Sequence, residues 1–343
     1  MPSRSAARLR IAVFGVGAVG ARLARQLLSS DQVASVALRD RRADHLAMVV
    51  ASLGDPAHAD GYEFSAPVDA DLVVLAGDPG EHGRIARRLL AQGLPVISVS
   101  DDVADVRALL DLDAEAKERG VSLVVGAGFT PGLSCVLAAH AASTFDQVDE
   151  IHVAKVGTGG PACARQHHRA LGARAVDWRD GWVERPGGSG RELCWFPDPI
   201  RARDCYRAAL PDALLLVPAF PGVSRVTARV AATRRDRLTA RLPMLWPTHP
   251  EGGLGAARVE VRGRRGVARD VVVFGAIDRP AVAAGSVAAI AALAVLNGEV
   301  RRPGAGGLAE LIDPVPFLTE LRRRGVRAAV FQGEPVEATG ANG

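Results

Sequence analysis

The feature that most constrains the fold is a set of three glycines, Gly15, Gly17 and Gly20, directly after the apolar run 9–14. The apolar run predicts a strand. From Val19 onward apolar residues repeat at helical spacing, so the glycines fall in the turn between a strand and a helix. In such a turn the first glycine bends the chain, the second exposes bare backbone to a pyrophosphate, and the third lets the helix pack closely on the strand. The pattern therefore predicts the opening unit of a dinucleotide-binding fold.

A second apolar run, 33–38, ends at Asp40, twenty positions after Gly20. An acidic side chain at that distance meets the adenosine ribose of a dinucleotide, and the N–H groups at the helix start hold its pyrophosphate. Further contacts are expected where later parallel strands end at the same edge of the sheet. The residues that we expect to bind the cofactor are Gly15, Gly17, Ala18, Val19, Gly20, Asp40, Arg41, Gly77, Asp78, Ser98 and Gly128.

Strands and helices alternate through the first 125 residues. We expect strands at 71–77, 94–99 and 121–125, helices at 45–53, 84–92 and 101–119, and a loop at 55–62. Alternation of this kind is typical of a parallel sheet with right-handed crossovers. The fold class is therefore α/β, with a Rossmann doubly wound parallel sheet over residues 1–130.

The pattern changes after residue 147, where apolar residues alternate with polar ones. We expect strands at 148–156, 193–196, 213–217, 223–233, 256–262 and 267–277, the last two joined as a hairpin through 263–266. Period-two strands with few helices predict a second α+β domain, 131–280, built on a mixed or antiparallel sheet. An alanine-rich helix at 281–297 follows, and residues 335–343 are expected to be frayed.

Composition excludes several classes of partner. No apolar run reaches the length of a membrane span, and the N-terminus has no separate apolar core typical of a signal peptide. The four cysteines predict reduced thiols and a cytoplasmic setting. The net charge of +4 comes from dispersed arginines, with only two lysines, so no nucleic-acid partner is expected. The cysteines and histidines match no zinc spacing, so no metal is expected.

The densest polar stretch runs from Lys155 through a glycine-rich turn to His168 and Arg169. A guanidinium binds a carboxylate through two hydrogen bonds, whereas an imidazole or a buried amine can exchange a proton near neutral pH. We therefore expect Lys155, His168 and Arg169 to be the catalytic and substrate-anchoring residues. The alternatives are a plain surface turn, or a pocket around the polar-aromatic groups at 177–184 and 195–203.

The loop after the strand at 121–125 reads Gly128-Phe-Thr-Pro-Gly132. It resembles the Gly-x-x-Pro-Gly loop of the saccharopine dehydrogenase-like oxidoreductases, which include saccharopine reductase and carboxynorspermidine dehydrogenase. The resemblance covers the first 145 residues and returns at 314–325. Thr130 departs from the Asp or Asn that often precedes the proline in that family.

That resemblance implies an NAD(P)-dependent oxidoreductase that transfers a hydride at a C–N bond, imine or secondary amine, of an amino-acid-like small molecule. It also implies that the loop lies beside the nicotinamide, that residues 281–334 return as helices to the first domain, and that the protein is a homodimer. Two other functions stay open: a dehydrogenase acting on a CH–OH or aldehyde group, and a dinucleotide-binding sensor or scaffold without turnover.

The choice of cofactor depends on the residues around Asp40. A carboxylate pairs with ribose hydroxyls and repels a 2′-phosphate, so Asp40 alone favours NAD. Arg39, Arg41 and Arg42 flank it and are able to clamp that phosphate. The family resemblance favours NADP, and NAD remains possible.

Overall fold

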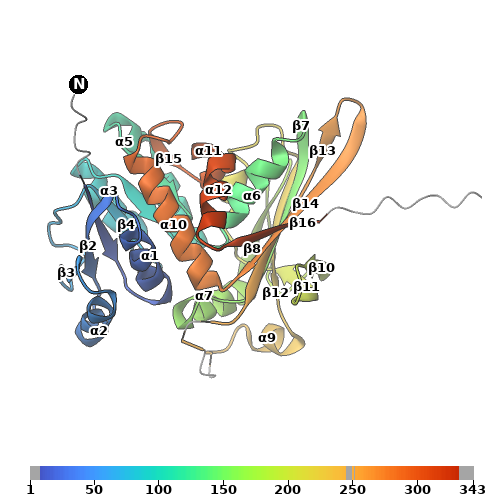
Figure 1. Cartoon of the computed structure of the whole chain (residues 1–343). Helices are drawn as coiled ribbons and strands as arrows, with labels where there is room; N and C mark the ends of the chain where they lie inside the picture. The colour runs from blue at the N-terminus through green and yellow to red at the C-terminus, as the bar shows by residue number, and fades with distance from the viewer. Residues whose placement is uncertain (1–7, 245–248, 251, 332–343) are drawn as a thin grey trace, which may run out of the picture.

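The computed structural model describes residues 8–244, 249–250 and 252–331, and these form two sheets with helices packed between them (Figure 1). The first sheet has seven parallel strands in the order β15-β6-β5-β4-β1-β2-β3. Their bounds are β1 (Leu9–Phe14), β2 (Val33–Arg39), β3 (Ala57–Ala59), β4 (Leu72–Leu75), β5 (Val96–Ser98), β6 (Ser122–Val125) and β15 (Gly304–Gly306). The expected α/β Rossmann class is confirmed, because strands β1 to β6 follow the doubly wound order.

Helices of the first 130 residues flank this sheet, as a parallel sheet with two buried faces requires. They are α1 (Ala18–Leu28), α2 (Ala43–Leu53), α3 (His82–Ala91), α4 (Val103–Leu110) and α5 (Asp113–Glu118). The single helix expected at 101–119 was wrong, since the chain breaks into α4 and α5 at Asp111 and Leu112. The break turns the side chain of Leu112 into the core, where it is 1% exposed. The expected loop at 55–62 contains the short strand β3.

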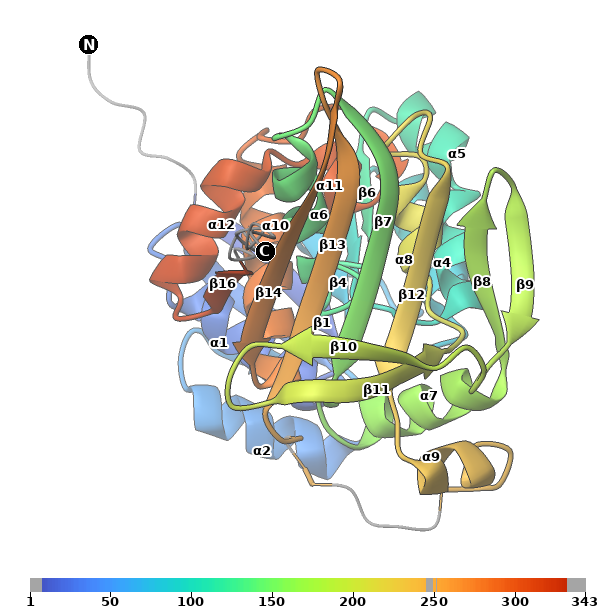
Figure 2. The same ribbon diagram turned by 90° about the vertical axis from the view of Figure 1, so that its right-hand side faces the viewer.

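The second sheet is mixed, as expected. Its path is β10-β11-β12-β7-β13-β14-β16, and β8 joins β12 and carries β9. The bounds are β7 (Gln147–Val156), β8 (Arg174–Arg179), β9 (Trp182–Pro186), β10 (Glu192–Phe196), β11 (Arg201–Arg207), β12 (Arg225–Ala231), β13 (Gly255–Arg265), β14 (Ala268–Asp278) and β16 (Arg327–Phe331). β12 runs parallel to β7, whereas β13 and β14 form the expected antiparallel hairpin. The hairpin β10–β11 crosses one end of the outer face (Figure 2).

Two parts of the second domain differ from expectation. The run 213–217, predicted as a strand, forms the helix α8 (Asp212–Leu216), because every residue of this segment is buried and an apolar run then has no periodicity to reveal its conformation. Strands β8, β9 and β11 were not predicted, since charged side chains interrupt their apolar alternation. The other helices of this domain are α6 (Leu133–Ala142), α7 (Pro161–Gly172) and α9 (Arg234–Thr239).

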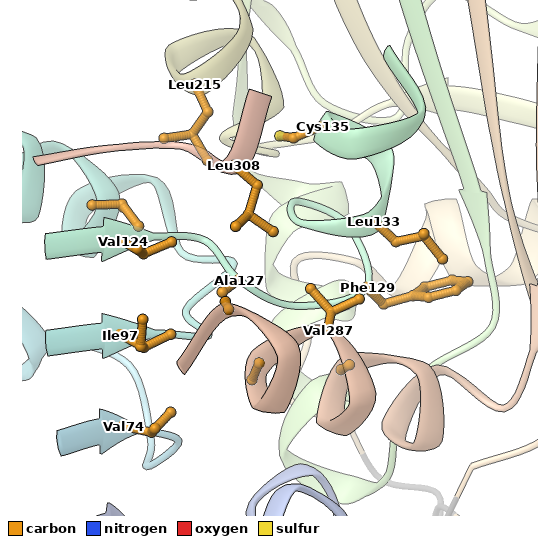
Figure 3. Close-up of a cluster of buried hydrophobic side chains, with 14 of the residues drawn as sticks. Val74, Ile97, Val124, Ala127, Phe129, Leu133, Cys135, Leu215, Val287 and Leu308 are labelled. Carbon is orange, nitrogen blue, oxygen red and sulfur yellow. The ribbon is translucent and has the colours of Figure 1, made fainter. Parts of the chain in front are cut away.

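The core between the sheets joins both domains. Side chains of the parallel strands, such as Val74, Ile97 and Val124, face Ala127, Phe129 and Val287 in the layer next to them (Figure 3). Val287 belongs to α10 (Pro280–Leu296), whose small residues allow close packing on α1: a Cβ at Gly285 would lie 2.8 Å from the backbone nitrogen of Leu23.

The C-terminal part of the chain contributes to both sheets. After α10, β15 pairs with β6 at the edge of the parallel sheet, and the chain then continues through α11 (Leu308–Leu311) and α12 (Pro314–Arg323). β16 pairs with β14 in the second sheet. Residues 281–331 therefore include two strands besides the helices expected there. The segment 335–343 lies outside the described residues.

Candidate active site

A cleft of about 650 Å³ opens at the carboxyl ends of the parallel strands. In open α/β sheets ligands bind in this position. One wall comes from the glycine turn and from loops of the first domain, including Asp40, Gly77 and Gly128. The other wall comes from β7 and the start of α7, including Lys155 and residues 157–163. Most of the residues expected to bind cofactor therefore share one cleft with Lys155.

The three glycines of the turn have different physical roles. Gly15 has φ +94°, and a Cβ on it would lie 2.4 Å from the Cα of Gly77. A Cβ on Gly20 would lie 1.9 Å from the carbonyl oxygen of Gly15, so helix and strand pack here without room for a side chain. A Cβ on Gly17 would meet no protein atom within 4 Å, because this glycine borders the cleft. The fold requires the first and third glycines, whereas the second matters only to a ligand.

The N-terminus of α1 faces the cleft with its N–H groups uncapped. Gly17 makes no side-chain cap, and the first turn of α1 contains no acidic residue. Ala18 and Val19 of that turn line the cleft, whereas Gly20 lies behind them against the strand. Free N–H groups and the positive end of the helix dipole together favour an anion. This donor set and the bare backbone at Gly17 fit a dinucleotide pyrophosphate.

Asp40 is buried at the end of β2, with its carboxylate aimed at the turn. Its Oδ2 accepts a hydrogen bond from the backbone N–H of Val16 at 2.9 Å, and its Oδ1 accepts one from the N–H of Arg42 at 3.0 Å. Burial favours the neutral acid, but these hydrogen bonds and the Arg42 guanidinium outweigh it and hold the pKa of Asp40 below its ordinary value. The group at the ribose position is therefore an ionised carboxylate.

The three arginines near Asp40 differ from one another. Arg39 is 1% exposed; its guanidinium donates to Asp60 at 2.8 Å and to the Ala66 carbonyl at 2.8 Å, so it stabilises the fold and the expectation that it clamps a phosphate was wrong. Arg41 and Arg42 line the cleft. Arg41 forms an ion pair with Glu81, and Arg42 pairs with Asp40.

Of the remaining residues expected to bind the cofactor, some line the cleft and one lies behind its wall. Gly77, Asp78 and Gly128 line the cleft. Ser98 does not: its side chain is buried and hydrogen-bonds to Nδ1 of His82 at 2.8 Å. The other ring nitrogen of His82 lies 3.2 Å from the carbonyl oxygen of Gly77, so Ser98 supports the cleft through His82. Burial lowers the pKa of His82.

Lys155 crosses from the second sheet to the first. It ends β7, is 6% exposed, and its Nζ lies 3.4 Å from both the Oδ2 of Asp101 and the carbonyl oxygen of Thr130. Asp101 follows β5 and lines the cleft, with a quarter of its side chain exposed. The hydroxyl of Thr130, buried at the same wall, has no hydrogen-bond partner in the described residues. The site thus combines an ammonium, a carboxylate and an unused hydroxyl.

His168 and Arg169 do not join Lys155. Neither lines the cleft: the His168 ring nitrogen Nε2 bonds to the carbonyl oxygen of Leu242 at 2.9 Å, and Arg169 is exposed. Both lie on α7 farther from its N-terminus: Arg169 follows Arg165 by one turn on the same face, so it lies past the end of the cleft. The expected constellation of Lys155, His168 and Arg169 is therefore not assembled in the structure.

Sequence reasoning missed the residues of α7 that do line the cleft. Arg165 is exposed there, one helical turn before Arg169. His167 lies nearby, and burial together with the charge of Lys155 lowers its pKa from 6.5 to about 3. The signal was the proline at position 161, which is favoured at helix starts and sets the helical phase of the segment.

The other polar groups considered from the sequence lie elsewhere. Trp178 packs edge-on against Trp182, and Glu184 forms an ion pair with Arg174. Arg201 forms an ion pair with Asp198. Among the described residues no cluster of three or more His, Cys, Asp or Glu side chains could hold a metal ion, and no helix is long and apolar enough to cross a bilayer.

Comparison with known proteins agrees with this assignment of the first domain. Residues 9–129 match the model of the GFO/IDH/MocA family, an oxidoreductase family with an NAD-binding Rossmann fold. The narrower saccharopine dehydrogenase-like group, expected from the loop at 128–132, stays a prediction. The first domain has a Rossmann fold, and its sequence is similar to the NAD-binding domains of that oxidoreductase family.

Solved structures extend the likeness to the whole chain. The apo saccharopine dehydrogenase (L-Glu forming) of Saccharomyces cerevisiae has a TM-score of 0.70 at 14% identity, over 94% of this chain and 100% of that one. GenD2 from gentamicin A biosynthesis, solved with NAD, has a TM-score of 0.47 at 18% identity, over 97% of this chain and 99% of that one. The first likeness establishes a shared fold and leaves the reaction open; the second is too distant to carry an argument.

Proposed function

Proceeding from an NAD-binding Rossmann domain of the oxidoreductase type, we propose that this protein is an NAD(P)-dependent oxidoreductase of the saccharopine dehydrogenase-like type, acting at a C–N bond of an amino-acid-like small molecule. The observation that carries the proposal is Lys155, a buried ammonium that reaches Asp101 across the cleft that also contains the glycine turn and Asp40. A dinucleotide at the turn and a proton donor in the same cleft are the two requirements for reducing an imine.

The chain's own residues supply a proton and an anchor. A reduced nicotinamide, when bound at the glycine turn and Asp40, would supply the hydride for the imine carbon. Lys155 donates a proton to the imine nitrogen, the C=N π electrons become the new N–H bond, and the lysine is left as a neutral amine. Asp101 stabilises the ammonium form and, being partly exposed, gives the lysine a route to recover its proton from water. In this proposal the proton comes from the wall that carries Lys155, opposite the wall that carries the glycine turn.

A substrate carboxylate would bind near the start of α7. Arg165 lines the cleft there and takes the anchoring role expected of Arg169. The buried hydroxyl of Thr130 offers a further donor or acceptor at the same wall. These groups favour a substrate that carries an acid and a nitrogen, which is why a C–N bond is proposed before a CH–OH bond.

The cofactor choice follows from Asp40 and its neighbours. The ionised carboxylate of Asp40 accepts hydrogen bonds from the backbone N–H groups of Val16 and Arg42. It supports NAD because a carboxylate pairs with the ribose hydroxyls and repels a 2′-phosphate. NADP, which the family resemblance favours, requires Arg41 and Arg42 to leave Glu81 and Asp40 for a 2′-phosphate. Both exchanges are feasible because each guanidinium is more than half exposed.

The proposal is tested by turnover. NADH and NADPH oxidation is measured with 2-oxo acids mixed with amino acids, with either pool alone, and with Lys155→Met. Turnover that requires both pools and falls in Lys155→Met supports the C–N assignment. Turnover with the oxo compounds alone means a CH–OH or aldehyde dehydrogenase. Dinucleotide binding with no turnover in any mixture means a sensor.

The homodimer remains a proposal. The hairpin β10–β11 covers only one end of the outer face of the second sheet (Figure 2). A second copy would cover the rest, and sedimentation at several protein concentrations would measure it. A monomer at every concentration would exclude it.

A further inference from the structure

A second cavity lies on the outer face of the second sheet, and none of its lining residues lines the cleft. Its volume is about 310 Å³, and it is lined by side chains of β8, β9, β11 and β12. Figure 2 shows β8 and β9 beside β12, with β11 crossing below. Its charged and hydrogen-bonding lining residues include Arg179, Arg185, Arg207, Arg225, Asp177 and Thr227.

Strand pairing forces like charges together here. Arg179 of β8 is the direct partner of Arg225 of β12, so both guanidinium groups project from one face. Arg207 of β11 is likewise the direct partner of Arg229 of β12. Like charges directly opposite each other destabilise a sheet. One such pair at the cavity, and a second of which only Arg207 lines it, need compensating negative charge.

The protein supplies only part of that charge. Asp177 accepts a hydrogen bond from Nε of Arg207 at 3.3 Å, and Arg229 pairs with Glu192 at 2.6 Å. Arg225 lies 3.8 Å from Glu150, and its buried Nε has no hydrogen-bond partner in the described residues. Burial raises the pKa of the Asp177 carboxyl, although Arg207 and Arg229 act to lower it.

Two arginines have no counter-charge at all. Arg179 and Arg185 are exposed at the cavity, and neither side chain makes a hydrogen bond or an ion pair within the part of the chain that the structure describes. Arg185 stands opposite Ala175 on β8, two residues from Asp177, which directs it to the same face as Arg179. The cavity therefore keeps an excess of positive charge, with Arg207 and Arg225 held in place behind it.

We propose that this cavity is a binding site for a compact oxyanion, a phosphate group or a pair of carboxylates on a small molecule, separate from the dinucleotide cleft. Guanidinium groups bind such oxygens through paired hydrogen bonds. The volume is at the lower end of the range for small-molecule sites, so the ligand is small. The anion relieves the repulsion between the paired arginines, and its binding stabilises the folded protein by an amount that grows with the logarithm of its concentration.

The test measures binding of inorganic phosphate and of malonate to the full-length protein by calorimetry, with the shift in Tm as a second readout. The wild type binds at least one of them, and Arg179→Gln/Arg185→Gln weakens that binding tenfold or more. Both positions are exposed, so the double variant keeps the fold. Tighter phosphate binding identifies a phosphorylated ligand, and tighter malonate binding identifies a dicarboxylate.

Two controls separate this site from others. Arg201→Gln removes an exposed arginine from the same strand as Arg207 but outside the cavity, and it leaves binding unchanged. Gly17→Val blocks the phosphate turn of the dinucleotide site and also leaves anion binding unchanged. The proposal is overturned if the wild type binds neither anion, if the double variant binds as tightly as the wild type, or if Gly17→Val abolishes binding.

Discussion

The Nζ of Lys155 and the Oδ2 of Asp101 lie 3.4 Å apart across the cleft, although the residues belong to different sheets and are 54 positions apart in the chain. The pair connects the segment after β5, at the carboxyl ends of the Rossmann strands, to β7 of the second sheet. A ligand in the cleft would contact both sheets at this point. One contact thus joins the domains and also holds the ammonium that we propose as the proton donor.

Replacing Lys155 by methionine is expected to lower kcat by about 10²–10⁴ with little change in dinucleotide affinity, because methionine keeps the length of the side chain and cannot donate a proton. Kinetics and a dinucleotide titration of the same preparation measure both. The matched control is Lys117→Met, the chain's other lysine, which lies on α5 in an exposed pair with Asp113. Equal kcat in the wild type and Lys155→Met would remove Lys155 from the mechanism.

Replacing Arg165 by glutamine is expected to raise KM about tenfold or more and to leave kcat nearly unchanged, if the guanidinium binds substrate and transition state alike. Steady-state kinetics with the substrate found by the turnover screen measures it. Arg169→Ala and His168→Ala, one turn further and outside the cleft, are expected to retain wild-type constants. If those two variants lose activity and Arg165→Gln does not, the substrate anchor is at His168 and Arg169 and not at Arg165.

Gly17→Val is expected to weaken binding of both dinucleotides by about a hundredfold and to leave Tm unchanged, because its Cβ enters only the space of the ligand. Loss of one or two charge-assisted hydrogen bonds, at about 1.5–3 kcal/mol each, accounts for that size. Gly20→Ala is the contrasting variant, since its Cβ would overlap the carbonyl of Gly15; it is expected to lose about 1–3 kcal/mol of stability. Calorimetric titration and chemical unfolding distinguish the two, and wild-type binding by Gly17→Val would refute the phosphate turn.

The double variant Arg41→Ala/Arg42→Ala is expected to lose NADPH affinity ten- to a hundredfold and to keep NADH affinity, if these guanidiniums hold a 2′-phosphate at about 1.5–3 kcal/mol. Arg87→Ala, on α3 and paired with Glu115, controls for the loss of general positive charge. Equal losses for both cofactors would instead mean that the arginines act by orienting Asp40 and Glu81.

Acid should destabilise the fold through His167. Its pKa falls from 6.5 to about 3 on folding because of burial and the charge of Lys155, so below pH 6.5 the unfolded chain takes up a proton that the folded chain does not. Stability then falls as pH drops from about 6.5 toward 3, by at most about 1.4 kcal/mol per pH unit from this residue. Denaturant unfolding across that range measures the slope, and His167→Gln is expected to reduce it. An unchanged slope in His167→Gln would contradict the shift.

Much of the first domain was predictable because local sequence determines it. The glycine turn, the apolar strands and Asp40 each have a signal within a few residues, and the cleft-lining positions at Gly77, Asp78 and Gly128 follow from where strands end. Arg39 was misassigned because charge alone does not reveal burial; only the loop at 60–67, folding over β2, shows where its guanidinium goes.

The second domain was less predictable for a different reason. Its contacts are made between distant segments, as Lys155 with Asp101, and nothing near either residue indicates the partner. Arg165 and Arg169 lie one turn apart on the same face of α7, and only the turn nearer the helix start reaches the cleft, which no local pattern indicates. The buried run at 213–217 contained no periodicity from which to distinguish helix from strand.

The C-terminal strands β15 and β16 leave the ribosome last, so both sheets can be completed only at the end of synthesis. β15 pairs with the edge of β6, and β16 pairs with the edge of β14, so these two edges stay unpaired until the last part of the protein has been synthesised. Unpaired edges are where nascent chains pair with the wrong neighbour. A premature stop before residue 304 would therefore leave two incomplete sheets, and neither domain can be expressed alone by cutting the gene at a single point.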